Sequence, residues 1–410
     1  MRVLFVNHTS RVSGAERSLL ELLAGLPYDV DPVVACPPGE FADRVRRLAM
    51  PCMSLPETVV SFRLHPWHTP RGLSQIGAAA GYLRRLAQVF NVELIHANSI
   101  RSGLVAGIAA TLGPPVIVHV RDCMPPGRTA GLVRRFMRSR VAEVFANSRY
   151  TAENFASATS TPPVRVVYNA VDLERFDPGR VDREVARRDL SLDSDALVLG
   201  VVSQITPWKA QDDAIRIISL LRAGGIDAIL LVVGGVKFAD ASTRYDNETF
   251  ERSLHALVST SGLMDAVRFL GERGDIPEIL RALDLVLVPS WEEPFGRILI
   301  EAMGMETPVL ATSVGGPVEV IDDGEQGILL PPRAPERWAD EAAVLLEDRE
   351  RRRAMGRKGR ATVAARFTRA AHVHAVLDGY EEILNAQTPT PRNGGRRPRL
   401  RRGARVMRST

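Results

Sequence analysis

Two acidic residues, Glu293 and Glu301, stand eight positions apart in the stretch from Pro289 to Ile321. The pattern around them predicts a buried strand, a proline-rich turn that carries Glu293, and a short helix that contains Glu301. Eight helical residues rise about 12 Å, which is similar to the span from a sugar hydroxyl across a diphosphate to a ribose. The spacing therefore indicates one acid for each polyol end of such a molecule.

The residues between the two acids are suited to hold a phosphate. We expect the backbone NH groups near Phe295 and Gly296 to open the helix, and the first NH groups of a helix lack partners and lie at its positive end. Gly296 has no side chain to block an anion. An ordinary strand–helix–strand packing unit is the alternative interpretation of this segment.

The run from Glu293 to Glu301, EPFGRILIE, resembles the donor-site signature of the family 4 retaining glycosyltransferases, which have the GT-B fold. Matching flanks extend the resemblance, namely Pro289-Ser290, Ala302-Met303, Pro308-Val309 and Gly315-Gly316. The resemblance covers about residues 1–386. It implies transfer of a sugar from a nucleotide-diphosphate sugar to an acceptor hydroxyl, in which Glu301 holds the ribose and Glu293 holds the transferred sugar.

The resemblance also implies other donor-site residues in the second half of the chain. Family members carry an Arg and, five residues later, a Lys that contact the diphosphate; this chain has Gln204 and Lys209. Lys209 keeps its charge, whereas Gln204 can only donate a hydrogen bond. The remaining expected donor-site residues are Phe295, Gly296 and Arg297 in the motif, and Gly271, which frames the nucleobase.

A small-residue loop near the N-terminus, with Ser13 and Gly14 before a predicted helix, can approach a phosphate or a sugar acceptor. The family pattern has two glycines there, and a plain helix cap by Ser13 is the alternative. His96 ends a predicted strand and matches the family pattern. It either lines the interdomain cleft or is a hydrogen-bonded core histidine.

The segment that ends at Asp122 departs from the family pattern. The family has a histidine near the reacting sugar immediately before this aspartate, and here Arg121 takes that position. His119, two residues earlier on a predicted strand, faces the same side as Arg121. We therefore expect His119 and Arg121 to act near the reacting sugar. The alternative is a buried His119 and an Arg121 paired with Asp122.

The overall pattern predicts an α/β protein with the GT-B architecture, two doubly wound Rossmann-like domains that face each other across a cleft. Apolar strand-like runs alternate with helical patterns at Val3–Val6, Pro32–Ala35, Leu94–Ala97, Pro115–Val120, Glu143–Ala146 and Arg165–Val167, and again at Leu197–Val202, Ala228–Val233, Val267–Leu270, Leu285–Val288 and Val309–Ala311. The expected parts are an acceptor-side domain (1–172), a linker (173–196), a nucleotide-sugar domain (197–366), a helix that crosses back (367–386) and a disordered basic tail (387–410).

Charge and cysteine content limit the possible partners and compartments. The net charge is +5, but from Gln387 onward there are eight arginines and no acid, which leaves −3 for the rest. We therefore expect no nucleic-acid groove. The tail and the arginines around Leu132–Arg140 make contact with an anionic membrane surface a testable alternative to plain solvation. Three scattered cysteines and no long apolar run favour a cytoplasmic protein, at most peripheral to the inner face of the membrane.

No metal and no cofactor are expected besides the nucleotide sugar itself. The run Asp193-Ser194-Asp195 precedes a predicted strand in a charged linker and is interpreted as a solvated turn. A glycan, a lipid-linked sugar or a small molecule is the expected acceptor. Two alternative functions remain open, a nucleotide-sugar-binding protein without transferase activity and a nucleotide-sugar epimerase with the same fold.

Overall fold

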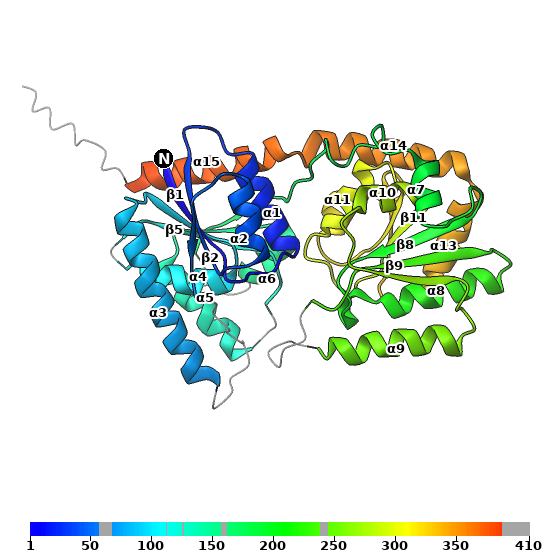
Figure 1. Ribbon diagram of the computed structural model, residues 1–410, viewed down its shortest axis with the longest axis horizontal. Coiled ribbons are helices and arrows are strands. Elements are labelled where there is room, and N and C mark those ends of the chain that lie inside the picture. The colour runs from blue at the N-terminus through cyan, green and yellow to red at the C-terminus, as the bar shows by residue number, and fades with distance from the viewer. Residues whose placement is uncertain (57–67, 112, 125–126, 157–161, 238–244, 388–410) are drawn as a thin grey trace, which may run out of the picture.

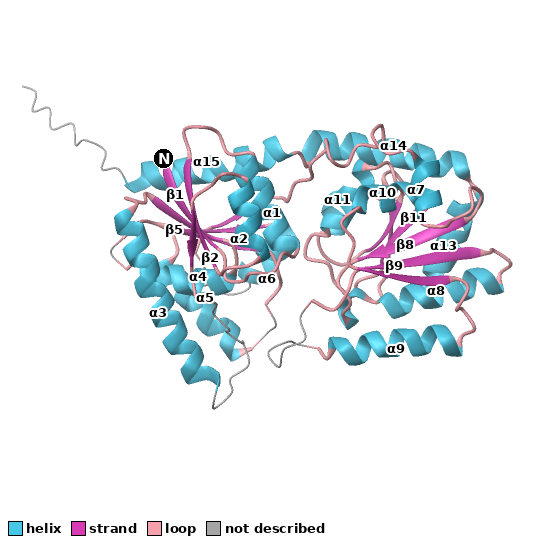
Figure 2. Cartoon of the chain, in the orientation of Figure 1, coloured by secondary structure: helices cyan, strands magenta, loops and turns pink. Residues whose placement is uncertain are grey.

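The computed structural model describes residues 1–56, 68–111, 113–124, 127–156, 162–237 and 245–387 of the chain. Two α/β units lie side by side and are joined along one side by long helices (Figure 1). In each unit a parallel sheet is covered by helices on both faces (Figure 2). This is the arrangement that continuous apolar strands alternating with helices predict, and the expected GT-B fold is confirmed.

The first unit contains a seven-stranded parallel sheet in the order β3-β2-β1-β4-β5-β6-β7. Its strands are β1 (Arg2–Val6), β2 (Asp31–Cys36), β3 (Cys52–Ser54), β4 (Leu94–Ala97), β5 (Val116–Val120), β6 (Glu143–Ala146) and β7 (Val164–Val166). Its helices are α1 (Gly14–Ala24), α2 (Glu40–Arg47), α3 (His68–Val89), α4 (Ile100–Ala109), α5 (Arg128–Arg140) and α6 (Arg149–Ala156). One core joins the sheet to α3, α4 and α5, and a second core joins the opposite face to α1 and α2.

The second unit contains a six-stranded parallel sheet in the order β10-β9-β8-β11-β12-β13. Its strands are β8 (Leu197–Val202), β9 (Ala228–Val233), β10 (Val267–Gly271), β11 (Leu285–Val288), β12 (Val309–Thr312) and β13 (Gly327–Leu330). Its helices are α7 (Arg183–Asp189), the 3₁₀ helix η1 (Pro207–Lys209), α8 (Gln211–Ala223), α9 (Asn247–Thr260), α10 (Ile276–Ala282), α11 (Arg297–Gly304), α12 (Pro317–Val320), α13 (Pro335–Glu347) and α14 (Arg349–Arg366).

The last helix, α15 (Arg369–Gln387), leaves the second unit and packs on the first. It covers the face that α1 and α2 also cover, where Tyr380 is fully buried. The chain crosses between the units at two adjacent points, because the Val171 NH donates to the Phe367 carbonyl oxygen at 3.0 Å. The two segments that connect the units, near Val171 and near Phe367, therefore lie side by side.

Three features of the fold were not predicted from the sequence. The edge strands β3 and β13 were missed, and the segment 173–196, expected as a linker, contains α7, which packs against α10. The expected tail from residue 388 lies outside the described residues. No helix in the described part of the chain is both long enough and apolar enough to cross a bilayer.

Candidate active site

Glu293 lies in the turn between β11 and α11, and its backbone is fixed by the glycine turn that follows β12. The Glu293 NH donates to the Val314 carbonyl at 3.1 Å, and the Gly316 NH donates to the Glu293 carbonyl at 2.8 Å. Gly315 has φ +103°, and a Cβ there would lie 2.1 Å from the Glu293 oxygen. Only glycine permits this approach, so the Gly-Gly pair positions the acid.

The Glu293 carboxylate is almost buried, with 5% of the residue exposed, and it is paired with Lys209. Oε2 accepts hydrogen bonds from Lys209 Nζ and, at 3.1 Å, from Ser290 Oγ. Lys209 ends η1, and its Nζ lies 4.1 Å from the centroid of the Trp208 ring. The structure thus brings together Lys209 and Glu293, which are 84 residues apart in the sequence.

Glu301 lies on α11, is also 5% exposed, and is paired with Arg297 one turn earlier. Arg297 Nη2 donates to Glu301 Oε1 at 3.0 Å. The other terminal nitrogen, Nη1, is buried and has no hydrogen-bond partner among the described residues. A Cβ on Gly14 would lie 3.9 Å from Arg297 Cδ, so the start of α1 in the first unit faces the start of α11 in the second.

Gly296 begins α11 in the left-handed region, with φ +83°. A Cβ at this position would lie 2.8 Å from Leu299 Cδ1 and 3.1 Å from Glu293 Cγ. The neighbouring Phe295 is buried in the core of the second unit. The Gly296 backbone therefore joins the two acids and opens the first turn of α11, where an anion is favoured.

The loop before α1 caps the helix and lies next to the second unit. Ser13 caps the helix, because its NH donates to Glu16 Oε2 at 3.1 Å and its hydroxyl bonds the same carboxylate. Burial raises the pKa of Glu16. Gly14 faces the second unit opposite Arg297. Across the same boundary, Lys237 Nζ donates to the Val12 carbonyl at 2.9 Å, so this loop contacts both units.

His96 and His119 do not reach the boundary between the units. The expectation that His119 acts near the reacting sugar is therefore corrected, and His96 is a core histidine that does not line the cleft. Both are fully buried. His96 Nδ1 lies 2.5 Å from the Tyr380 hydroxyl, and the two histidine rings are 5.5 Å apart. Their side chains leave β4 and β5 on the face that α15 covers, and burial lowers the pKa of each well below its usual value.

Arg121 also points into the first unit, which corrects the expectation that it acts near a sugar. Its guanidinium donates to Ser18 Oγ at 2.6 Å, Asn169 Oδ1 at 2.5 Å and Asn98 Oδ1 at 3.3 Å, and it lies 3.1 Å from His119 Nδ1. Burial lowers the pKa of Arg121 to about 9. The guanidinium thus makes its hydrogen bonds to neutral side chains, and it forms no salt bridge with Asp122.

Asp122 is the residue that sequence reasoning passed over. It follows β5 and is exposed. Although the residue is exposed, partial desolvation by the surrounding protein raises the pKa of its carboxyl, Glu293 acts in the same direction, and Lys209 and Arg101 oppose the rise. Asp122 therefore lies within electrostatic range of the Lys209–Glu293 pair. The signal was available, because Asp122 occupies the aspartate position of the family motif.

Gln204 follows the carboxyl end of β8, and Gly271 is the last residue of β10, at the edge where ligands bind in such sheets. The Gln204 carbonyl accepts from Gln211 Nε2 at 2.8 Å. Gly271 has φ +64°, and the space around a Cβ there is open to 4 Å. Among the described residues, no group of three His, Cys, Asp or Glu side chains is placed to hold a metal ion.

Comparison with known proteins identifies the family. The model named "Glycosyltransferase Family 4" matches residues 12–175, and "Glycosyl transferases group 1" matches residues 182–362. The D-inositol 3-phosphate glycosyltransferase of Stackebrandtia nassauensis is 32% identical over 321 residues, covering 73% of this chain and 70% of that protein. The chain belongs to glycosyltransferase family 4. The protein of the same name from Segniliparus rotundus is 34% identical over 332 residues, covering 76% and 71%.

Solved structures agree with this assignment of the family 4 glycosyltransferase. Anabaena HepE in complex with UDP and glucose is 25% identical with a TM-score of 0.80, covering 93% of this chain and 99% of HepE. WaaG, a glycosyltransferase involved in lipopolysaccharide biosynthesis, has the same fold, with a TM-score of 0.68 at 17% identity, covering 95% of this chain and 100% of WaaG.

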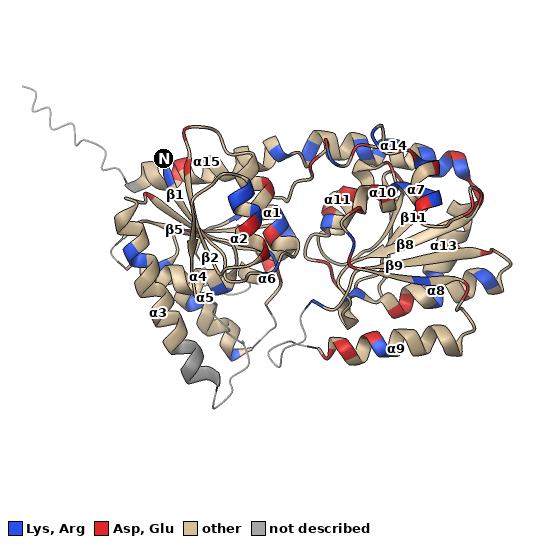
Figure 3. Ribbon diagram, in the orientation of Figure 1, with Lys and Arg blue, Asp and Glu red and all other residues tan. Residues whose placement is uncertain are grey.

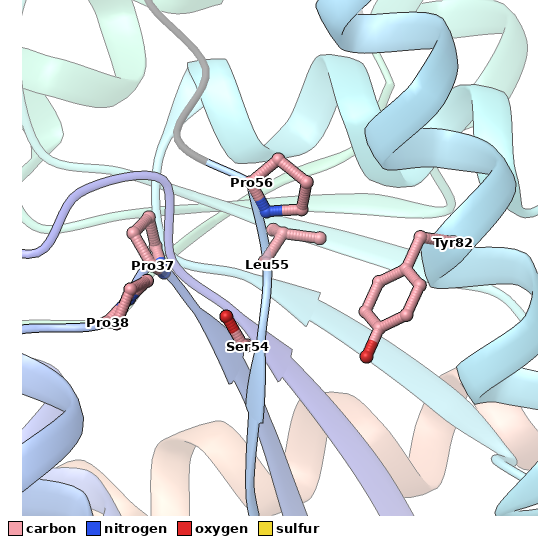
Figure 4. Close-up of a pocket in the computed structure, with 6 residues that line it drawn as sticks. All are labelled: Pro37, Pro38, Ser54, Leu55, Pro56 and Tyr82. Carbon is pink, nitrogen blue, oxygen red and sulfur yellow. The ribbon is translucent and has the colours of Figure 1, made fainter.

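The first unit of this glycosyltransferase also has an apolar hollow that the sequence did not indicate. It lies beyond the carboxyl ends of β2 and β3 and beside α3, and encloses about 570 Å³. Its lining consists of Pro37, Pro38, Ser54, Leu55, Pro56 and Tyr82 (Figure 4). The hollow is at the strand edge that also carries the β1–α1 loop.

Proposed function

We propose that this enzyme transfers a sugar from a nucleotide-diphosphate sugar to an acceptor hydroxyl, with retention of anomeric configuration and without a metal ion or other cofactor. The observation that supports it best is the pair of nearly buried acids Glu293 and Glu301, each held by a cation at the boundary between the units. Buried acids with movable cationic partners suit a ligand that carries both hydroxyls and phosphates.

The proposed binding step exchanges these partners. Glu301 turns to the ribose hydroxyls and Glu293 turns to a hydroxyl of the transferred sugar. Lys209 and Arg297, released from the acids, turn to the diphosphate. Arg297 Nη1, which is buried and has no hydrogen-bond partner among the described residues, gains one. Each charge then keeps a partner of opposite sign or a hydrogen bond, so the exchange avoids burying an unpaired charge.

The proposed chemical step takes place on the face of the sugar that the leaving group occupies. The acceptor oxygen forms a bond to the anomeric carbon as the bond from that carbon to the diphosphate oxygen breaks, and the departing phosphate oxygen accepts the acceptor proton. Lys209 and the NH groups at the start of α11 stabilise the charge that develops on the diphosphate. Such fixed charges supply the stabilisation that a metal ion provides elsewhere.

The relatives indicate which substrates to test first. Curated relatives are named for D-inositol 3-phosphate, and HepE binds UDP and glucose. We therefore propose a UDP-sugar as the donor and a phosphorylated polyol as the first acceptor. Arg101, at the start of α4, places positive charge close to Asp122 and His8 on the acceptor side.

Donor binding tests the proposal directly. The unfolding temperature of the wild type is measured with UDP, GDP, ADP and their sugars, without added metal and with EDTA. We expect one nucleotide to raise it and Glu301→Ala to abolish the rise. Glu325→Ala is the matched control, because Glu325 is exposed and its salt bridge is to Lys358. An equal rise in Glu301→Ala would show that Glu301 does not hold the ribose.

Product formation separates the enzyme from a sugar-nucleotide-binding protein. Gln204 carries no charge where the family has an arginine, and this difference is the reason to test for a binding protein without transferase activity. Purified protein is incubated with the donor that binds and with inositol phosphate, and the products are resolved by mass spectrometry. A glycosylated acceptor is expected. Binding of the donor without product for any hydroxyl acceptor would favour the binding protein.

A further inference from the structure

The helical layer formed by α3, α4 and α5 carries positive charge and no negative charge. None of the three helices contains an Asp or Glu. Their exposed arginines, among the side chains that the structure describes, are Arg84, Arg85, Arg128, Arg135, Arg138 and Arg140. In Figure 3 this region of the first unit shows blue segments on its helices. The asymmetry therefore belongs to these three helices, whereas α6, which packs on the same face, carries the exposed Glu153.

The opposite face of the same sheet is balanced. On α2, Arg44 bonds Glu40 and Arg46 bonds Asp43, both at 2.7 Å. By contrast, no salt bridge of Arg135 or Arg138 is formed within the described ranges of the chain. The charges of Arg135 and Arg138 are thus not neutralised by an acid in the described part of the chain, whereas two of the three arginines of α2 are.

Large apolar side chains are exposed among these arginines. Leu132 on α5 is 67% exposed, Val89 at the end of α3 is 73% exposed, and Ile108 on α4 is 39% exposed. An isolated exposed apolar residue needs no explanation. Here three adjacent helices combine exposed apolar side chains with arginines and with no acid, which is the composition of a surface that lies at a bilayer interface.

The layer is also held together as one body. Arg84 on α3 donates to the Ala109 carbonyl at 3.0 Å, at the carboxyl end of α4. Arg140 on α5 donates to Thr111 Oγ1 at 2.9 Å, beyond the same end of α4. A partner that binds one helix therefore meets all three in a fixed arrangement, so the charges act together.

We infer that the α3–α5 layer docks this enzyme on an anionic lipid bilayer. The arginines lie at the level of the lipid phosphates, and Leu132, Val89 and Ile108 enter the region where headgroups meet acyl chains. A nucleic acid would use the arginines but would leave these three side chains in water. The inference does not depend on the donor or acceptor, because neither donor-site acid lies in the layer.

Vesicle flotation of the full-length protein tests the inference. The vesicles are phosphatidylcholine alone or with 30% phosphatidylglycerol, at 50 mM and 300 mM salt. We expect binding to the anionic vesicles and its loss at the higher salt. Because each arginine at such a surface contributes about 1 kcal/mol, Arg135→Gln/Arg138→Gln should weaken partitioning about 30-fold. Leu132→Ser should weaken it about tenfold.

The matched control is Arg46→Gln/Arg47→Gln, which removes two exposed arginines from α2 on the opposite face. It should partition like the wild type, as both double variants carry the same net charge and the same basic C-terminal segment. Three outcomes would overturn the inference. They are no binding to anionic vesicles, equal loss in both double variants, and a wild-type affinity for duplex DNA that exceeds vesicle binding and is insensitive to Leu132→Ser.

Discussion

At the scale of single residues, Lys209 is the cation that the proposed chemistry uses most. It is paired with Glu293 and is proposed to stabilise the leaving diphosphate. Lys209→Met should lower kcat by about 10²–10³, the usual effect of removing one group that stabilises developing negative charge. The measurement is steady-state transfer at saturating donor. Lys358→Met, which removes an exposed lysine paired with Glu325, should leave kcat unchanged.

Gly296 permits a second prediction at this scale. Gly296→Ala combines a left-handed backbone, φ +83°, with a Cβ 2.8 Å from Leu299 Cδ1. We expect a loss of about 2–3 kcal/mol in the free energy of unfolding by urea. Gly262→Ala is the control, since Gly262 has φ +65° and open space around it, so only the backbone term of about 1 kcal/mol applies. Equal losses would show that Leu299 moves aside at no cost.

At the scale of secondary structure elements, α15 is held to the first unit by three buried histidines, His96, His119 and His372. Burial lowers the pKa of all three, that of His372 to about 3, and the nearby guanidinium of Arg121 adds to the effect. His372 Nδ1 donates to the Tyr168 carbonyl at 2.6 Å. The neutral form of each ring is therefore the one that packs under α15.

Acid should consequently loosen α15. Below about pH 6.5 the three histidines are protonated in the unfolded chain but stay neutral in the folded chain. The free energy of unfolding therefore falls as the pH drops from about 6.5 toward 3, by up to about 1.4 kcal/mol per pH unit for each histidine. Glu16 acts in the opposite sense, because burial raises its pKa. Urea unfolding between pH 7.5 and 5 should show a shallower pH slope in His119→Gln than in the control, the exposed His374→Gln. Equal pH slopes in the two variants would show that His119 does not stay neutral in the folded protein.

The elements also show what the sequence can and cannot predict. The turn and the helix that carry Glu293 and Glu301 follow from local pattern, whereas Lys209 was expected only from the resemblance to the family. The surroundings of His119 and Arg121 do not follow from local pattern. Strand alternation predicts that they share a side, but the residues that cover them are distant in the sequence. His119 packs against His372 of α15, and Arg121 bonds Ser18 of α1 and Asn169. Edge strands β3 and β13 were missed because short strands have a weak periodic signal.

At the scale of the whole molecule, the Glu319 carboxylate makes several of the hydrogen bonds that link the two units. Glu319 on α12 of the second unit accepts from the NH groups of Arg149 and Tyr150 at the start of α6, and from the Tyr168 hydroxyl, each at 2.9 Å. A second link joins Ser148 Oγ to the Pro294 carbonyl at 2.6 Å, next to Glu293. The position of the first unit is therefore fixed within a few residues of Glu293.

Removing this carboxylate should separate donor binding from transfer. Glu319→Ala leaves the α6 NH groups without their acceptor and weakens the contact between the units, while the donor site of the second unit keeps its residues. We expect kcat to fall about tenfold, as small displacements of reacting groups are costly, with less than a twofold change in the affinity for the donor. Small-angle scattering should show a larger radius of gyration. Glu325→Ala removes an exposed acid from the same unit and should change none of these quantities. A Glu319→Ala variant that loses donor affinity and kcat in parallel would instead place Glu319 within the donor site.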